Sequence, residues 1–434
     1  MTDVLIAGGT VIHHDATERA DVLIRDGRVA DIAPSLARPA GAHVIDADGC
    51  WVGPGFVDLH THLREPGREE AETVASGARA AAVGGYSAVV AMPNTEPAID
   101  SAMVAQFVLD RGRDALVEVA VAGAITVGRQ GTHLAPIADM AALGVRLFTD
   151  DGTGVQDPLI LRRALTYARP LGVTLAEHCE DEALAAGGVM NEGHVSSRLG
   201  LSGRPALAEE LMVMRDIELV RLTGCPMHFL HLSTARSIDL VRKARADGLP
   251  VTCEVAPHHL FFDESVCEHY DALFKVHPPL RTRGDVDALQ AALRQGDVDA
   301  VATDHAPHAP ELKDLPFDDA PPGMLGLEHA ASITRGVMGD DPIGFFRALS
   351  RGPAAIAHLR ARDERPRHTA HGGDVAVGED ANLVVFDPAD TYRVERHGLQ
   401  SRAHNTPYDG LELTGRARAL VVRGIPRLDQ GQLT

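Results

Sequence analysis

An apolar run that ends in two histidines and an arginine stands early in the chain: Trp51-Val-Gly-Pro-Gly-Phe-Val-Asp-Leu-His60-Thr-His62-Leu-Arg64. Its apolar part predicts a buried strand rather than a helix. Because side chains two residues apart on a strand point to the same side, His60 and His62 face one spot. A strand that ends in paired imidazoles offers a rigid start to a metal site. Two histidines that cap a strand end would give the same pattern, so the metal interpretation depends on further ligand-type residues later in the chain.

The middle of the chain alternates β-branched apolar runs with helical patterns rich in Ala, Leu and Arg. The predicted strands are Gly55–His60, Ser87–Met92, Glu118–Gly123, Val145–Thr149, Val173–His178, His228–His231, Val251–Val255 and Ala300–Asp304. The clearest helical patterns are Glu69–Val83, Asp157–Tyr167, Ala206–Leu222 and Thr234–Asp247. Eight β-then-α repeats predict an α/β protein with a (β/α)₈ TIM barrel rather than a doubly wound sheet. No Gly-x-Gly-x-x-Gly motif and no P-loop follow the first strand, which disfavours a nucleotide site.

The two ends of the chain carry further β patterns, with a hairpin signal at Asp26-Gly27. Neither end alone has enough strands for a stable core. We therefore expect both ends to form one small, β-sandwich-like domain, with the barrel inserted between them. The predicted boundaries are residues 1–52 and 366–434 for the β domain and residues 53–365 for the barrel.

Composition and charge narrow the classes of function. The 434 residues carry a formal net charge of −20, which argues against binding to nucleic acid or to an anionic membrane surface. An anionic substrate must then be held by local arginines. The five cysteines form no CxxC pair and are odd in number, which favours free thiols in the cytoplasm. We see no signal peptide and no segment as long as a membrane span.

Ligand-type side chains stand at the ends of the predicted strands, where a barrel places its active site. They are His60, His62, Asp151, His178, His231 and Asp304, and Asn94 lies just past the second strand. Four imidazoles and two carboxylates suit one or two divalent metals, for which zinc is the expected ion. His178 or His231 alone would more often be a hydrogen-bonded core histidine, and Asp151 alone would more often cap a turn. Six such residues at the right strand ends favour the metal site.

The expected chemistry is hydrolysis of a C–N bond. A carboxylate between two metals can bridge them and leave a shared water as the nucleophile. Asp304 could both ligate a metal and take the proton of that water, then pass it to a leaving nitrogen. Arg64 lies on the same side of the strand as His62 and could hold a substrate carboxylate in a bidentate pair. A salt bridge at the barrel rim would explain Arg64 equally well.

The run Asp58-Leu-His-Thr-His-Leu-Arg-Glu-Pro-Gly67 resembles the signature of the dihydroorotases, cyclic amidohydrolases of the amidohydrolase superfamily. Further matches extend over nearly the whole chain: Met92-Pro-Asn94-Thr, Phe148-Thr-Asp-Asp151-Gly, Glu177-His178-Cys, His231-Leu-Ser-Thr, Pro257-His-His259, Pro278-Pro-Leu-Arg281 and Ala302-Thr-Asp304-His-Ala-Pro-His308. The pattern is similar to the bacterial monofunctional type I enzymes, in which an aspartate, here Asp151, replaces the bridging carboxylated lysine of related enzymes.

The resemblance implies the reversible ring opening of dihydroorotate to N-carbamoyl-aspartate, the third step of pyrimidine synthesis, with one or two zinc ions per subunit. It assigns the six residues above to metal. Arg64 and Asn94 would hold the substrate carboxylate, and His308 and the backbone near Pro322 and Gly323 would contact the ring. The family usually has asparagine where this chain has His277, so that substrate contact departs from the family pattern.

Other features carry weaker expectations. His258 and His259 are expected to make structural hydrogen bonds, and His305 to pack or to support the site. The stretch Ala309–Pro322, rich in Pro and Asp, is expected to be a long loop and a candidate lid. Homo-oligomerisation and association with aspartate transcarbamoylase are compatible with the sequence.

The sequence leaves two alternatives open. A dihydropyrimidinase, hydantoinase or allantoinase would share the barrel, but such enzymes generally use a bridging lysine and lack an arginine like Arg64. A non-catalytic dihydroorotase-like partner of aspartate transcarbamoylase would be expected to have lost metal ligands, and all six stand in this chain.

Overall fold

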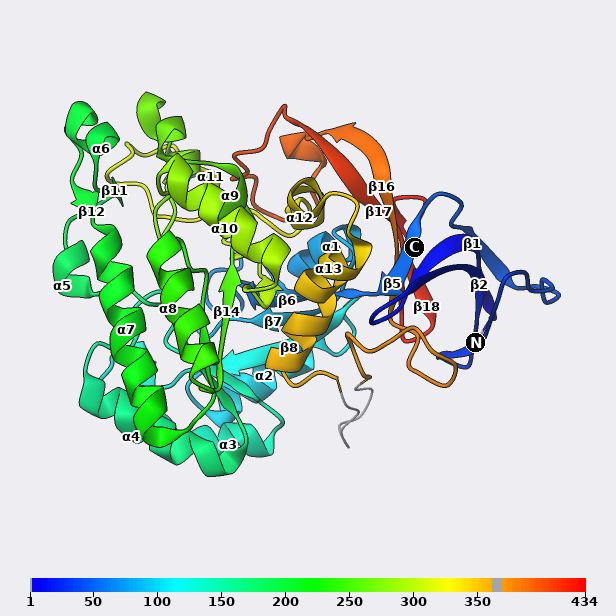
Figure 1. Cartoon of the computed structure of the whole chain (residues 1–434), viewed down its shortest axis with the longest axis horizontal. Helices are drawn as coiled ribbons and strands as arrows, with labels where there is room; N and C mark the ends of the chain where they lie inside the picture. Colours follow the sequence, from blue (N-terminus) through cyan, green and yellow to red (C-terminus); the bar gives the residue numbers. More distant parts are fainter. Residues whose placement is uncertain (1, 361–368) are drawn as a thin grey trace.

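The computed structural model describes residues 2–360 and 369–434. Two bodies lie side by side, a larger one in which helices surround strands and a smaller β domain that carries both termini (Figure 1). The predicted boundary between residues 365 and 366 lies outside the described residues. None of the described helices is long and apolar enough to cross a membrane.

Eight parallel strands form the centre of the larger body. In sequence order they are β6 (Phe56–Thr61), β7 (Tyr86–Ala91), β8 (Glu118–Gly123), β9 (Leu147–Thr149), β10 (Thr174–Glu177), β13 (Met227–Phe229), β14 (Val251–Val255) and β15 (Ala300–Val301). Neighbours in sequence are neighbours in the sheet. A parallel bridge between Thr61 and His305 brings the eighth strand back to the first. The predicted (β/α)₈ barrel is confirmed.

Helices follow the strands and cover the barrel. They are α1 (Val74–Val83), α2 (Ala102–Gly112), α3 (Ile137–Ala142), α4 (Pro158–Ala168), α5 (Glu182–Ala185), α6 (His194–Leu199), α7 (Ala206–Thr223), α8 (Ala235–Ala246), α9 (Pro257–Phe261), α10 (Arg283–Gln295), α11 (Pro310–Lys313), α12 (Ala330–Met338), α13 (Pro342–Phe346) and α14 (Gly352–Ile356). A two-stranded parallel pair, β11 (Met190–Asn191) and β12 (Gly203–Arg204), lies between α5 and α7. Thr73 and Thr282 cap α1 and α10 with their side chains, as Thr does at helix starts.

The smaller body is a nine-stranded sheet built from both ends of the chain. Its strands are β1 (Val4–Ile12), β2 (Thr17–Arg25), β3 (Arg28–Ala33), β4 (His43–Asp46), β5 (Trp51–Pro54), β16 (Leu383–Arg393), β17 (Glu412–Val422), β18 (Ile425–Asp429) and β19 (Gln432–Leu433). The antiparallel pair of β5 and β16, with Val52 opposite Val385, joins the two ends. The prediction that the termini share one β domain is confirmed.

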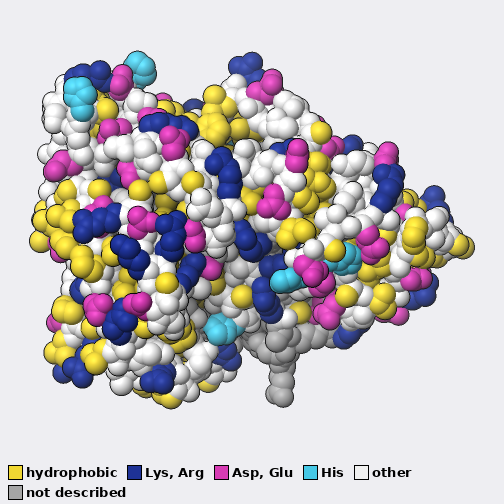
Figure 2. All heavy atoms as spheres, in the orientation of Figure 1, with side chains coloured by type: hydrophobic (Ala, Val, Ile, Leu, Met, Phe, Trp, Pro, Cys, Tyr) yellow, Lys and Arg dark blue, Asp and Glu magenta, His cyan; other side chains and the backbone are white. Residues whose placement is uncertain are grey.

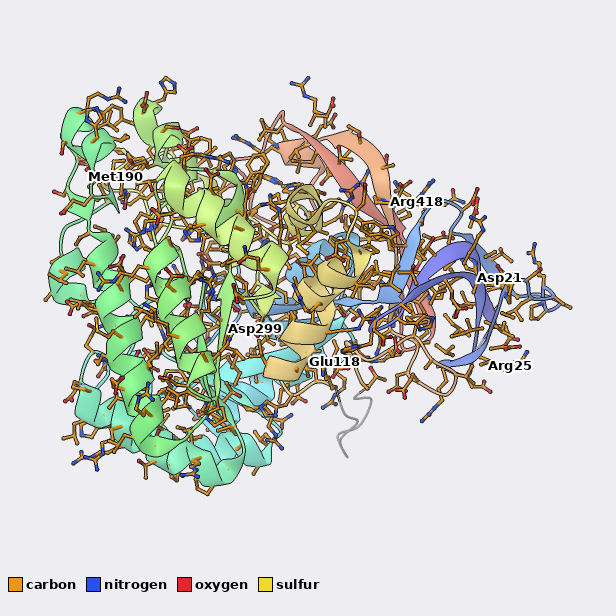
Figure 3. All side chains as sticks on the ribbon, in the orientation of Figure 1. Asp21, Arg25, Glu118, Met190, Asp299 and Arg418 are labelled. Carbon is orange, nitrogen blue, oxygen red and sulfur yellow. The ribbon has the colours of Figure 1, made fainter. Side chains whose placement is uncertain are left out.

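The predicted hairpin at Asp26-Gly27 links β2 and β3. Both residues have positive φ, 51° and 80°, as a two-residue turn between twisted strands requires. Asp21 and Arg25 of β2 and Arg418 of β17 lie on this sheet, whereas Met190 lies at the opposite end of the molecule (Figure 3).

The surface carries mixed charge. Acidic and basic side chains are interspersed over the face shown in Figure 2, and apolar side chains gather at its edge over α5 and α7. Leu207, Leu211 and Met214 of α7 are exposed there and follow one another at helical spacing.

Candidate metal and active site

The six predicted metal ligands meet at the carboxyl ends of the strands. Two groups of three lie with their ligand atoms within 4.8 Å of one another. One group is His60, His62 and Asp151, and the other is Asp151, His178 and His231. All of them are buried. Since Asp151 belongs to both groups, one carboxylate stands between two sets of imidazoles, which is the arrangement of a two-metal site.

Asp151 uses its two oxygens differently. Its Oδ1 lies 3.3 Å from His60 Nε2 and 3.6 Å from both His178 Nδ1 and His231 Nε2. Its Oδ2 lies 3.6 Å from His62 Nε2. Burial alone would raise the pKa of Asp151, but the surrounding histidines hold it well below its usual value. The carboxylate is therefore ionised and can face two cations at once.

Asp304 closes the site from the eighth strand. Its Oδ1 lies 3.0 Å from His62 Nε2 and 3.6 Å from His60 Nε2. Burial alone would raise the pKa of Asp304, but the hydrogen bond with His62 and the charge of His60 hold it below its usual value. The residue has a φ of 45°, a conformation that costs a non-glycine residue energy and that recurs at functional sites.

Carboxylate and amide groups behind the histidines fix their tautomers. His60 Nδ1 lies 3.0 Å from Glu254 Oε1, so its Nε2 faces the centre. His62 Nδ1 donates to Asn94 Oδ1 at 2.8 Å, which leaves Nε2 towards Asp304. Such outer partners orient a metal-binding histidine and raise its basicity. Asn94 thus supports His62 in this structure, besides the substrate contact that was predicted for it.

The donor set fits a metal. His60 Nε2 is buried and has no hydrogen-bond partner within the described part of the chain, although two carboxylates lie within 3.6 Å. His178 Nδ1 and His231 Nε2 lie 2.9 Å apart and point at the same carboxylate. Four imidazoles and two carboxylates that converge on one place, with His60 Nε2 left without a partner among the described residues, suit a divalent cation.

The predicted substrate residues form a second group beside the ligands. Arg64 is 5% exposed, has a φ of 59°, and donates from Nε to Pro307 O at 3.1 Å. Burial, and then the neighbouring Arg68, lower the pKa of Arg64 to about 9. His308 Nε2 donates to Pro322 O at 2.8 Å. At Gly323, with a φ of 134°, a Cβ would stand 2.8 Å from His308 Nε2, so only glycine allows this approach.

His277 lies at the mouth of the site. It lines a cavity of 170 Å³ that also reaches His178, and a neighbouring cavity of 470 Å³ that reaches Lys275. Both cavities share Arg204 with His277. Burial, followed by the positive charge of Arg204, holds the pKa of His277 well below its usual value. The imidazole is therefore neutral and can donate or accept a hydrogen bond.

Comparison with known proteins now decides the family. A family model described as "Dihydro-orotase-like" matches residues 49–237. A dihydroorotase of Mycobacterium tuberculosis is 46% identical over 428 residues, 97% of each chain, and one of Streptomyces coelicolor is 44% identical over 441 residues, 100% of each. The chain belongs to the dihydroorotase family.

Solved structures support the same fold. An L-hydantoinase from Arthrobacter aurescens has a TM-score of 0.88 at 24% identity and covers 100% of this chain and 98% of its own. A dihydropyrimidinase from Brevibacillus agri has a TM-score of 0.83 at 25% identity, with 100% and 96% covered. At this identity the likeness shows that this dihydroorotase family member shares its barrel and terminal β domain with other cyclic amidohydrolases.

Two supporting residues were missed from the sequence. Glu254 is fully buried in β14 and lies 3.0 Å from both His60 Nδ1 and His228 Nε2. Burial would raise the pKa of Glu254, but these two histidines lower it to about 2. Its signal was an acidic residue inside an apolar strand. Asn405 hydrogen-bonds the loops that carry His308 and Gly323, and its sequence gave no comparable signal.

The residues with weaker expectations lie around the site. His259 Nε2 donates to Pro278 O at 3.0 Å, and His258 packs against it with ring centroids 4.4 Å apart. His305 Nε2 donates to the buried Glu72 at 3.3 Å, while its Nδ1 accepts from Gly326 N. The stretch 309–322 is not a loop throughout, because α11 forms within it. Whether it moves as a lid stays a prediction.

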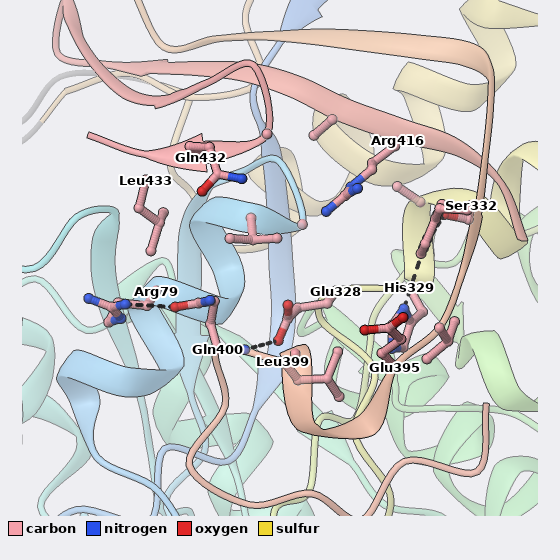
Figure 4. A pocket seen from close by; sticks show the side chains of 18 of the residues that line it. Arg79, Glu328, His329, Ser332, Glu395, Leu399, Gln400, Arg416, Gln432 and Leu433 are labelled. Atoms are coloured by element: carbon pink, nitrogen blue, oxygen red, sulfur yellow. Dashed lines mark hydrogen bonds between the residues drawn. The ribbon is translucent and has the colours of Figure 1, made fainter. Parts of the chain in front are cut away.

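A further cavity, of 590 Å³, lies away from this site (Figure 4). It lies at the interface between the barrel and the terminal β domain, where Arg416 and Glu328 line it from the two sides. Glu328 accepts from Gln400 N at 2.8 Å, and Arg79 donates to the Gln400 side chain at 2.7 Å. No predicted site residue lines this cavity.

Proposed function

We propose that this chain is a dihydroorotase, which hydrolyses (S)-dihydroorotate reversibly to N-carbamoyl-L-aspartate in de novo pyrimidine synthesis. The observation that carries the proposal is the combination of Asp151, shared by two groups of imidazoles, with a buried arginine, Arg64, beside them. A bridging aspartate and a carboxylate-binding arginine match a ring that bears a carboxylate. The 46% identity with a named dihydroorotase over 97% of the chain supports the same substrate.

The metal is proposed to be zinc, one or two ions per subunit. The residues that would hold it are His60, His62, Asp151, His178, His231 and Asp304. When bound, the ion polarises the scissile carbonyl and lowers the pKa of a water so that hydroxide is available near neutral pH. Glu254 and Asn94 keep the imidazoles of His60 and His62 in the tautomers that leave Nε2 towards the centre.

Asp304 is the proposed proton carrier. It is ionised and lies next to both imidazoles of the His-x-His pair, so it can accept a proton from the attacking water. The same carboxyl group then donates this proton to the departing ring nitrogen. One residue thereby serves as base and as acid, and the ring opens without a charged leaving group.

Residues beside the metal ligands would hold the substrate with its scissile carbonyl at the metal. Arg64 offers its guanidinium to the ring carboxylate, together with Asn94. His308, His277 and the backbone at Pro322 and Gly323 would contact the ring. Arg64 is desolvated by its surroundings, which strengthens an ion pair with a bound carboxylate.

The deciding experiment is hydrolysis of L-dihydroorotate by the purified protein, with metal content measured on the same sample and with dihydrouracil and allantoin as controls. We expect turnover of dihydroorotate alone, lost on chelation and restored by zinc. Turnover of a control instead would contradict the role of Arg64. A zinc-loaded but inert protein would favour a non-catalytic partner of aspartate transcarbamoylase.

Assembly and location are also proposals. We infer that the chain works in the cytoplasm, as a homo-oligomer or together with aspartate transcarbamoylase. The exposed Leu207, Leu211 and Met214 of α7 offer an apolar surface for such contacts. Sedimentation of the purified chain, alone and mixed with the transcarbamoylase, separates these states, and a monomer in both samples would contradict both associations.

A further inference from the structure

Four of the residues proposed to hold substrate, Arg64, His308, Pro322 and Gly323, depend on two loops. Residues 305–308 follow the eighth strand, and residues 321–325 lie beside them. Arg64 Nε donates to Pro307 O at 3.1 Å, and His308 Nε2 donates to Pro322 O at 2.8 Å. The position of the first loop therefore fixes Arg64 and His308, and the second loop carries Gly323. Whatever sets the spacing between these loops also sets the shape of the substrate site.

Asn405 joins the two loops with a single side chain. It lies between β16 and β17 of the terminal β domain and is 3% exposed. Its Oδ1 accepts from His308 N at 3.1 Å, and its Nδ2 donates to Ala306 O at 2.9 Å and to Gly323 O at 3.2 Å. Its backbone carbonyl accepts from Leu325 N at 3.2 Å.

We propose that Asn405 is a positioning residue for the substrate, supplied to the barrel by the terminal β domain. The proposal rests on the proposed function. Only an amide provides one acceptor and two donors in this geometry, so the side chain is matched to the three backbone groups it meets. Because those backbone groups are buried, a group that loses its hydrogen bond to Asn405 would be left without a partner.

The contacts of Asn405 reach the substrate groups and not the metal ligands. Its side chain meets backbone at 306, 308 and 323, and none of its described hydrogen bonds goes to an imidazole or carboxylate of the metal groups. A change at Asn405 should therefore alter how tightly the ring is held, with little effect on metal binding or on proton transfer by Asp304. This separation distinguishes positioning of substrate from general support of the fold.

The chain contains a matched control. Asn382 is also 3% exposed, accepts from Arg423 N at 2.8 Å and donates to Ala370 O at 2.8 Å. Its backbone carbonyl accepts from Gly55 N, at the amino end of β6 and so at the opposite end of the barrel from the site. The same substitution at Asn382 disturbs the same kind of buried amide without touching the substrate loops.

The test compares Asn405→Asp with Asn382→Asp in the zinc-loaded, full-length protein. At Asn405 the new carboxylate would face two carbonyl oxygens, and we expect the KM for dihydroorotate to rise at least about tenfold while kcat changes less than about threefold. Metal content should stay at the wild-type level. Asn382→Asp should lower the Tm by a similar amount and leave KM unchanged. Asn405→Ser, which adds no charge, serves if the aspartate variant fails to fold.

The possible results distinguish failure of this proposal from failure of the proposed function. An unchanged KM in the folded Asn405 variants, or an equal rise in KM in Asn382→Asp, would overturn the proposal. Loss of metal together with kcat would also overturn it, because Asn405 would then act through the metal ligands. An inert wild-type protein would overturn the proposed function, and this proposal with it, whereas an active wild type with unaltered variants overturns this proposal alone.

Discussion

Glu254 and His60 form a hydrogen bond of 3.0 Å between the seventh strand of the barrel and the first. The same carboxylate lies 3.0 Å from His228 Nε2 and accepts from His231 N at 3.3 Å. Glu254 is fully buried and ionised, with its pKa lowered to about 2 by His228 and His60 against the effect of burial. A single side chain therefore orients proposed ligands from two strands, although it binds no metal itself in this scheme.

Glu254→Gln tests this relationship. The amide keeps the volume of the carboxylate, but one of its two polar atoms becomes an N–H donor. His60 and His228 both face a carboxylate oxygen in the wild type, so one of them would lose its acceptor, and we expect metal affinity to fall about 10- to 100-fold. Competition with a chelator measures it. Glu177→Gln is the matched control, because Glu177 is also buried, its pKa is raised well above the usual value by burial, and it accepts from Val155 N. Equal metal affinity in both variants would contradict the role of Glu254.

Asp304→Asn tests the proton carrier. The amide keeps the size of the side chain but cannot accept the proton of the attacking water, so we expect kcat to fall by at least about 10³-fold with metal still bound. Metal analysis and turnover are measured on one sample. Asp151→Asn provides the contrast, since a residue that belongs to both ligand groups should lose metal as well as activity. Near-normal turnover in Asp304→Asn would show that another group moves the proton.

Most of the barrel could be predicted because its strands are buried on both faces and therefore appear as continuous apolar runs. All eight predicted strands exist, and each overlaps its prediction. The predicted start of the first helix, Glu69, was wrong, because α1 begins at Val74. The helical pattern from Glu69 extended too far, because Thr73 caps α1 with its side chain and the residues before it turn back, with Ala71 N donating to Arg68 O. The mostly polar residues 69–73 therefore belong to the turn between the first strand and α1, and not to the helix.

The convergence of the proposed ligand residues could be predicted from local sequence, because a barrel brings the ends of its strands together. Their supports could not, because each acts across a long stretch of chain. Glu254 is 194 residues from His60, and Asn405 is 97 residues from His308. Nothing near Asn405 in sequence carries chemistry that would connect it with the site. Hydrogen bonds between residues so far apart in the sequence can be identified only once the structure shows that the two residues are neighbours.

Arg64→Met tests the proposed carboxylate contact. Methionine keeps much of the apolar stem but loses the guanidinium, so we expect the KM for dihydroorotate to rise about 10- to 100-fold, with a smaller effect on kcat. Arg68→Met is the control, because Arg68 is partly exposed and its nearest acidic partner, Glu96, lies 4.0 Å away. Steady-state kinetics at saturating zinc separates the two. A similar KM in both variants would contradict the proposed contact between Arg64 and the substrate carboxylate.

Lys313→Met tests a buried charge beside the substrate loop. Lys313 is 7% exposed and donates to Pro321 O and Gly323 O, and burial lowers its pKa from 10.5 to about 7. Below about pH 7 folded and unfolded chains both bind the proton. Between about pH 7 and 10.5 the Lys313 side chain binds more protons in the unfolded chain than in the folded one, so the free energy of unfolding rises by up to about 1.4 kcal/mol per pH unit.

Urea unfolding across this range checks the sign of the effect. The wild type should gain stability from about pH 7 to 9 relative to Lys313→Met, because the buried ammonium loses its proton only in the folded state. Lys243→Met, a substitution of an exposed lysine on α8, should follow the wild type. If the two methionine variants show the same pH dependence, Lys313 is charged in the folded protein throughout, and its two carbonyl partners compensate its burial.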